Sequence, residues 1–165
     1  MEYKIFLGYL AVIIGIVSYI PYITNIFRGK TKPHAFSWLV WAVLTGIAFA
    51  AQVIENGGAG TWVTGATALT CMVIFILALF KGNIKFSFFD WSSLIAAFTA
   101  MLFWKLTNDP LIAVILVTLT DALGFFPTFR KAYYKPYEET TITFAISSIK
   151  FAIAIIALSS FSIAT

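Results

Sequence analysis

Charged residues, cysteine and histidine are all scarce in this sequence, and their scarcity excludes most classes of soluble protein. Asp, Glu, Lys and Arg together make up 11% of the 165 residues, whereas hydrophobic residues make up 61%. Soluble domains are about 25% charged, so this composition predicts an integral membrane protein with the lipid bilayer as its surroundings. Nucleic acid is not an expected partner, because the net charge of +4 arises from short turns between apolar segments.

The few reactive side chains also argue against an enzyme. The chain has one cysteine, Cys71, inside an apolar run, and one histidine, His34, in a basic turn. Together they make neither a disulfide framework nor a metal cluster, and no nucleophile is paired with a base. The sequence has no glycine-rich phosphate loop either. We therefore expect no catalytic residues, no metal and no cofactor.

Six apolar segments are long enough to cross a membrane as helices, which takes about 20 residues each. Turn residues and charges separate them, in the stretches RGKTKP, ENGGAG, KGNIK, TNDP and KPYEE. The sequence therefore predicts an all-α integral membrane protein with six transmembrane helices. The predicted helices are Ile5–Phe27, Ala35–Ile54, Thr61–Phe80, Phe88–Leu106, Leu111–Arg130 and Thr141–Ser162.

Basic residues near the helix ends indicate an orientation, because Lys and Arg accumulate in cytoplasmic turns. Only Lys4 and Lys105 lie near the turns on one side. The turns on the other side carry Arg28, Lys30, Lys32, Lys81, Lys85, Arg130, Lys131 and Lys135. This bias predicts an outside N-terminus in a multi-pass protein of the cell membrane, such as the inner membrane of a bacterium or archaeon.

The first and fifth predicted helices end in related sequences. Pro21 and Pro127 each precede a helix end by a few residues, and each is followed by a basic turn. The turns close on Lys-Pro-His at 32–34 and on Lys-Pro-Tyr at 135–137. The charge bias gives both helices the same direction. A parallel repeat of three helices needs one extra helix between its copies, and the fourth helix supplies it.

This pattern resembles the PQ-loop superfamily, which includes the SWEET and SemiSWEET (MtN3-type) sugar transporters, the KDEL-receptor fold and the nicotinamide riboside transporters. It is also similar to uncharacterised bacterial seven-helix proteins of this type. The resemblance rests on the two prolines and their basic turns, although Tyr22 and Thr128 stand where the motif has glutamine. The stretch WLVW, with Trp38 and Trp41, resembles the paired-tryptophan motif of nicotinamide riboside transporters.

The resemblance implies a three, one, three arrangement of helices, of which this sequence supplies three, one and two. It divides the chain into a first three-helix bundle at 1–80, a linker helix at 81–108 and an incomplete second bundle at 109–165. We expect either a seventh helix in a longer chain or a neighbouring protomer that fills its place in a homo-oligomer. The resemblance also implies that Pro21 and Pro127 are hinges, the other interpretation being static kinks.

Asp121 and Lys150 are the ionisable residues deep within predicted helices. Asp121 lies nine residues before Arg130, and Lys150 lies ten residues after Thr140. At about 1.5 Å per residue both sit about 14 to 15 Å from the cytoplasmic ends. Because a charge at this depth is costly, we expect a buried ion pair that either couples to protons or substrate, or fixes the register of the helices.

The second predicted helix carries a mixed aromatic and polar face. Its members, at spacings of three or four, are Ser37, Trp41, Thr45, Ala48 and Gln52. Indole rings can stack on a ring-bearing substrate while hydroxyl and amide groups supply directional hydrogen bonds. For the two tryptophans, Trp38 and Trp41, the other interpretation is anchoring at the membrane surface. We expect Gln52 and Asn25 to form hydrogen bonds between helices.

These features favour transport of a small polar metabolite by alternating access at a site near the middle of the membrane. The substrate class stays open between a sugar, a nucleoside or vitamin, and an amino acid, and proton coupling is one option. The alternative is a receptor or assembly protein that uses the same fold to hold a ligand without moving it.

Overall fold

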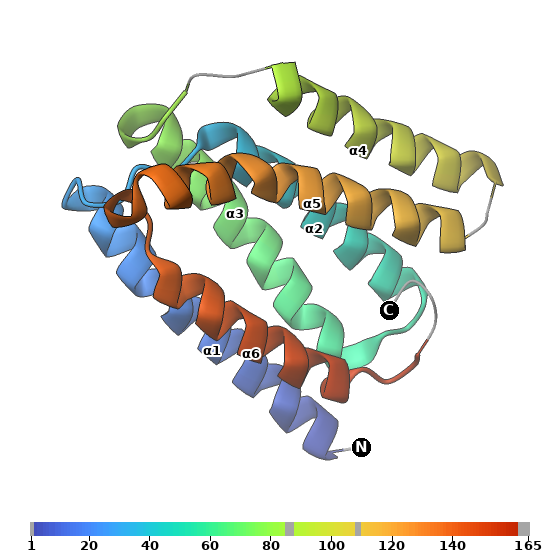
Figure 1. Ribbon diagram of the computed structural model, residues 1–165. Helices are drawn as coiled ribbons and strands as arrows, with labels where there is room; N and C mark the ends of the chain where they lie inside the picture. Colours follow the sequence, from blue (N-terminus) through green and yellow to red (C-terminus); the bar gives the residue numbers. More distant parts are fainter. Residues whose placement is uncertain (1, 85–87, 108–109, 162–165) are drawn as a thin grey trace.

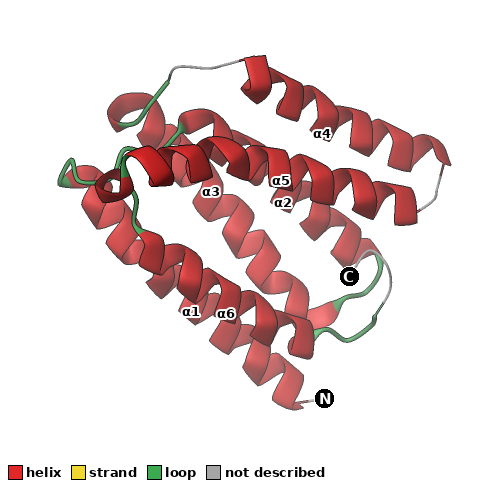
Figure 2. Ribbon diagram, in the orientation of Figure 1, coloured by secondary structure: helices red, strands yellow, loops and turns green. Residues whose placement is uncertain are grey.

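The protein is all-α over the residues that the computed structural model describes, which are 2–84, 88–107 and 110–161 (Figure 2). No strand occurs within these ranges, as the composition predicts. Two short 3-10 helices, η1 and η2, lie in the turns before α3 and α6. The elements are α1 (Glu2–Phe27), α2 (Ala35–Ile54), η1 (Gly58–Thr61), α3 (Trp62–Lys81), α4 (Phe88–Thr107), α5 (Pro110–Tyr134), η2 (Pro136–Glu138) and α6 (Thr141–Ala157).

The predicted boundaries agree with the structure to within a few residues for five helices, and α2 matches at both ends. The prediction was wrong for the end of α6, which stops at Ala157 instead of continuing to Ser162. Hydrogen bonds to the turn after α2 compete with the helix here. The backbone N–H of Ser159 donates to the Gly57 carbonyl at 2.9 Å, and Ser160 Oγ donates to the Glu55 carbonyl at 2.9 Å.

Three helical segments are long and apolar enough to cross a membrane, among the described residues. They are Glu2–Phe27, Ala35–Ile54 and Gly58–Lys81, while Thr141–Ala157 is a shorter apolar helix. Large apolar side chains are exposed along their outer faces, for example Phe6 and Ile13 on α1 and Leu69 on α3. Apolar surface of this extent suits contact with lipid.

The first and last helices, α1 and α6, lie side by side (Figure 1). Helix α3 packs against both α1 and α2. Helix α6 lies along α1, and α5 packs against α2 and α4. Within the described residues the backbones of α5 and α6 do not pack together, although the rings of Phe125 and Phe144 lie 6.4 Å apart. Each helix of the hairpin α1–α2 is thus paired with one helix of the hairpin α5–α6.

The turns after α1, α3 and α5 meet at one end of the bundle. The backbone N–H of Ala35 donates to the Asn83 carbonyl at 3.0 Å, and the N–H of Asn83 donates to the Pro33 carbonyl at 2.8 Å. The N–H of Lys32 donates to the Glu138 carbonyl at 3.2 Å. These turns hold most of the basic residues, so one end of the molecule is basic and held together by backbone hydrogen bonds. Lys85 lies outside the described residues.

Candidate functional site

Six aromatic residues from four helices meet between the hairpins α1–α2 and α5–α6. We call this set the central aromatic cluster: Tyr19 and Tyr22 of α1, Trp38 and Trp41 of α2, Phe125 of α5 and Phe144 of α6. The ring centroids of Trp38 and Trp41 lie 5.1 Å apart, and those of Trp41 and Phe125 lie 4.6 Å apart. Edge and tilted contacts of this kind stabilise aromatic pairs beyond the area that they bury.

Both tryptophans belong to the interior rather than to the surface. Trp38 is 2% exposed and Trp41 is 6% exposed. Trp38 Nε1 donates a hydrogen bond to the hydroxyl of Tyr22 at 3.2 Å, whereas Trp41 Nε1 is buried without a complete hydrogen bond. The structure therefore places them between the hairpins α1–α2 and α5–α6, where the face on α2 predicts a binding surface, and away from a lipid-facing position.

Asp121 lies on the face of α5 that packs against Trp41. The Trp41 indole is the side chain that interacts with the Asp121 carboxylate, although it completes no close hydrogen bond in this conformation. Gly124, one turn later, leaves the indole room, since a Cβ atom there would lie 3.4 Å from Trp41 Nε1. A small movement of α5 would therefore let the Trp41 N–H bond to the Asp121 carboxylate, and a polar ligand between them could bond to both.

Lys150 is fully buried between α6, α1 and α3. Its Nζ donates to Thr67 Oγ1 at 2.9 Å and, more weakly, to the hydroxyl of Tyr19 at 3.4 Å. The ammonium also lies 4.7 Å from the centre of the Tyr19 ring and 4.8 Å from that of Phe151. Gly15 makes room for the side chain, because a Cβ atom there would meet Lys150 Cδ at 3.1 Å.

The expected ion pair between Asp121 and Lys150 is absent from the described part of the chain, and that prediction was wrong. Lys150 bonds to hydroxyl groups, and Asp121 faces Trp41. The cause is helix packing: α6 lies on α1 and α5 lies on α2, so two residues at equal depth point into different interfaces. Cys71 of α3 is near enough to each of them for an electrostatic interaction.

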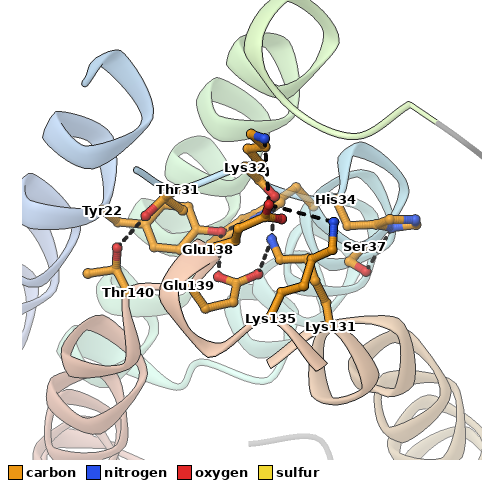
Figure 3. A network of polar contacts seen from close by, with 11 residues as sticks. Tyr22, Thr31, Lys32, His34, Ser37, Lys131, Lys135, Glu138, Glu139 and Thr140 are labelled. Atoms are coloured by element: carbon orange, nitrogen blue, oxygen red, sulfur yellow. Dashed lines mark hydrogen bonds and ion pairs between the residues drawn. The ribbon is translucent and has the colours of Figure 1, made fainter. Parts of the chain in front are cut away.

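A second polar cluster joins the turns after α1 and α5 at the basic end, as Figure 3 shows. Its centre is Glu139, whose carboxylate forms an ion pair with Lys131 Nζ at 2.6 Å and accepts a hydrogen bond from the Tyr22 hydroxyl at 3.2 Å. Lys131 also donates to the backbone carbonyl of Lys32. We call Tyr22, Lys131 and Glu139 the loop triad. Through Tyr22 and Trp38 it continues into the central aromatic cluster.

The loop triad is largely hidden from solvent. The side chain of Glu139 is 3% exposed and that of Lys131 is 12% exposed. Burial raises the pKa of Glu139 above its ordinary value, while the charge and hydrogen bond of Lys131, the Tyr22 hydroxyl and the Thr140 backbone N–H act in the opposite direction. Glu139 therefore holds a proton more tightly in this buried position than it would in water.

The role of Glu139 in this cluster was not predicted from the sequence. The charges of Glu138 and Glu139 indicate only that both residues favour the start of the sixth helix. Neither caps α6 in the structure, where the N-cap is Thr140 and has no side-chain cap bond. The half-buried Glu138 pairs loosely with Lys32 at 3.5 Å and Lys135 at 3.7 Å. No local pattern in the sequence indicates that Glu139 meets Tyr22 and Lys131.

Asn25 and Gln52 occupy opposite ends of the molecule. Asn25 Nδ2 donates to Thr140 Oγ1 at 3.1 Å, and Thr31 shares a 2.6 Å hydrogen bond with the same hydroxyl. The expected link between helices is therefore present at Asn25, at the basic end. Gln52 lies near the end of α2, and its Oε1 is buried without a hydrogen bond. The predicted site residues thus spread over three places instead of one.

Both predicted hinge prolines lie inside helices. Pro21 is within α1, and the helix continues past it to Phe27. Thr143 Oγ1 of α6 donates a 2.8 Å hydrogen bond to the Ser18 carbonyl, three residues before Pro21. The backbone at Pro127 is part of α5, but its side chain lies outside the described residues.

No family model, curated protein or solved structure matches the chain in comparisons with known proteins. The geometry of the central aromatic cluster, of Lys150 and of the loop triad is therefore the basis for assigning a function.

Proposed function

We propose that the chain is a multi-pass membrane carrier that moves a small polar metabolite by alternating access. In this proposal all six helices cross the membrane, the basic end faces the cytoplasm, and the N-terminus lies outside. The two hairpins α1–α2 and α5–α6 belong to two parallel copies of one repeat, in the manner of PQ-loop and SWEET-like transporters. The substrate would pass between these copies, where the central aromatic cluster lies.

One observation supports this proposal most strongly. Helix α1 packs on α6, and α5 packs on α2. If α5 and α6 are the repeats of α1 and α2, a twofold relation between the copies turns one of these contacts into the other. Two bundles related in this way can rock about a central site, which is the usual mechanism of carriers built from repeats.

In this proposal the loop triad and the central aromatic cluster close the carrier at its basic end. Glu139 bonds to Tyr22 of α1, and Lys131 bonds to the Lys32 carbonyl in the turn after α1, so these two residues tie the connections after α1 and α5 together. The rings of Trp38, Trp41 and Phe144 fill the space behind them. Opening between the two hairpins at the basic end would break the bond of Glu139 to Tyr22 and that of Lys131 to the Lys32 carbonyl, and would hydrate both side chains. Because burial raises the pKa of Glu139, hydration on opening would lower it again.

Uptake into proteoliposomes tests the proposal. The purified chain is reconstituted and offered a panel of radiolabelled sugars, nucleosides, vitamins, amino acids and organic acids, with protein-free liposomes as the control. Saturable uptake of at least one compound is expected. Ligand binding without flux across the entire panel would instead establish the receptor alternative.

Asp121→Asn tests proton coupling once a substrate is found. The change keeps the size of the side chain and the contact with Trp41 but removes the carboxylate. We expect uptake that no longer responds to an imposed pH gradient, with unchanged folding by size-exclusion chromatography. Glu2→Gln on the first turn of α1 is the matched control. Normal, pH-dependent uptake by Asp121→Asn would exclude a coupling role for Asp121.

A further inference from the structure

No described neighbour of Lys150 provides a negative charge to balance its ammonium group. Among the described residues its hydrogen-bond partners are the neutral hydroxyls of Thr67 and Tyr19, and its other close neighbours are the rings of Tyr19 and Phe151. A buried ammonium without a counter-ion is costly, so groups of this kind in membrane helices mark binding sites for ions or substrates.

Hydrogen-bond donors around Lys150 remain unused. The ammonium has three N–H groups and donates two of them. The hydroxyl of Tyr19 accepts from Lys150 and donates to no described residue in a complete hydrogen bond. Ser147, one turn before Lys150, has a buried Oγ without a hydrogen-bond partner and lies beside the Tyr19 hydroxyl. One ammonium N–H and two hydroxyls are thus available to an acceptor.

Thr67 determines on which side of Lys150 the free hydrogen-bond donors lie. Its hydroxyl donates to the Val63 carbonyl at 2.6 Å, so its oxygen is left to accept from Lys150. The free donors therefore lie on the side of Tyr19 and Ser147. A carboxylate has two oxygens with about four lone pairs, enough to accept all three donors, and its single charge balances the single ammonium. A phosphate dianion would leave a net negative charge in a buried place.

The space beside Lys150 leads toward an apolar groove. In this conformation the space, lined by Gly15, Tyr19, Thr67 and Thr70, is too narrow to admit a water molecule. The groove lies between α1 and α3, has a volume of about 250 Å³, and is lined by Ile16, Tyr19, Ile20, Ile23, Leu69, Thr70 and Val73. Ile16, Tyr19 and Thr70 line both spaces. A movement of the Tyr19 ring would therefore join the charged space to the groove.

We infer that the Lys150 cluster, defined as Lys150, Tyr19, Thr67 and Ser147, binds the carboxylate of a short-chain monocarboxylate whose apolar tail occupies the groove between α1 and α3. The Lys150 cluster adjoins the central aromatic cluster at Tyr19, which belongs to both, so the inference names a substrate class for the proposed carrier and in that sense rests on the proposed function. The ligand supplies the counter-ion that Lys150 lacks, and the apolar tail contacts Ile20 and Val73 of the groove.

Cys71 provides the readout, because it is the only thiol of the chain and is buried. A thiol-reactive dye that fluoresces on reaction reports the unfolding temperature of the purified protein in neutral detergent. Hexanoate is the probe, and hexanamide is the matched uncharged control. Sodium chloride and inorganic phosphate at equal ionic strength control for non-specific anion effects.

We expect hexanoate to raise the unfolding temperature by about 3 to 6 °C at ten times its dissociation constant. Hexanamide, chloride and phosphate should leave it unchanged, and Lys150→Met should abolish the hexanoate shift. Lys105→Met, a change of an exposed lysine on α4, should keep the shift. A shift with hexanamide equal to that with hexanoate, a shift retained in Lys150→Met, an equal shift with chloride or phosphate, or no shift with hexanoate would each overturn the inference.

Two milder variants keep the test decisive if Lys150→Met does not fold. Tyr19→Phe and Ser147→Ala each remove one free donor and should weaken hexanoate binding by about two- to tenfold. Unchanged affinity in both would overturn the inference. Binding is measured without flux, so hexanoate binding without any uptake would refute the carrier and keep the site. Uptake of other compounds without hexanoate binding would do the reverse.

Discussion

The hydroxyl of Thr143 in α6 donates a 2.8 Å hydrogen bond to the backbone carbonyl of Ser18 in α1. The bond lies three residues before Pro21, whose missing N–H leaves α1 one backbone hydrogen bond short. A side chain of one hairpin thus supports the weakened turn of the other. If Pro21 is a hinge, Thr143 is the residue through which a bend in α1 reaches α6.

Pro21→Ala should stiffen α1, because alanine restores the N–H that the helix lacks and favours a straight course. Under the proposed function we expect slower uptake together with equal or higher thermal stability. Proteoliposome uptake and thermal unfolding measure the two effects. Pro136→Ala, in the exposed turn of η2, is the control. Unchanged uptake by Pro21→Ala would identify a static kink.

Trp38→Phe and Trp41→Phe should differ in stability although each removes one indole. Trp38 loses its hydrogen bond to Tyr22, whereas Trp41 loses an N–H that is buried without a complete bond. We therefore expect Trp38→Phe to be the less stable variant by about 0.5 to 1.5 kcal/mol. Thermal unfolding of the pair measures the difference. Equal losses would mean that the Trp38–Tyr22 bond contributes nothing.

Lys150→Met should stabilise the protein, since it replaces a buried unpaired charge by an apolar side chain of similar length. We expect a gain of about 1 to 3 kcal/mol in the free energy of unfolding. The gain would be measured in ligand-free detergent, beside Lys105→Met as the control. A clear loss of stability would show that the bonds to Thr67 and Tyr19 make Lys150 a structural residue.

Glu139 should make the stability of the wild-type protein depend on pH. Its pKa is raised by burial, so the folded protein binds this proton more tightly than the unfolded chain does. The contribution is present below the ordinary pKa of about 4.5 and is lost as the pH rises through the raised value. We expect the unfolding temperature of Glu139→Gln to depend less on pH between those two pKa values.

Glu138→Gln is the matched control for this effect, because it removes the same charge from a neighbouring residue whose ion pairs are longer and more exposed. A wild-type unfolding temperature that instead increases with pH across the interval, and does so only when Glu139 is present, would mean that the ion pair with Lys131 outweighs the burial of Glu139.

The helices could be predicted from the sequence because apolar length and turn residues are local properties. The start of α2 at Ala35 follows directly from the turn that contains Pro33, and its end at Ile54 precedes Asn56 and Gly57. The end of α6 depends instead on a distant turn, because Ser159 and Ser160 bond to Gly57 and Glu55. No local pattern carries that information.

For the candidate site, the positions of single residues along their helices could be predicted from the sequence, but their neighbours could not. Depth along a helix follows from counting residues, and both Asp121 and Lys150 are inside helices as expected. Which neighbour each one faces depends on the rotation and pairing of the helices, and these place Trp41 beside Asp121 and Thr67 beside Lys150. The role of Glu139 was missed for the same reason, since Tyr22 lies 117 residues from it in sequence.

The two ends of the bundle are held by different kinds of contact. At the basic end the side chains of Tyr22, Lys131 and Glu139 join α1 to the turn after α5, whereas at the other end Lys4 Nζ and the backbone N–H of Ser159 bond to backbone carbonyls of Leu158 and Gly57. Glu139 and Lys131 are largely buried, so dissolved salt screens their ion pair little, whereas it weakens the longer and more accessible ion pairs of Glu138. Under the proposed orientation, the ionic strength of the cytoplasm would then loosen the outer ion pairs of the basic end while the loop triad stays closed.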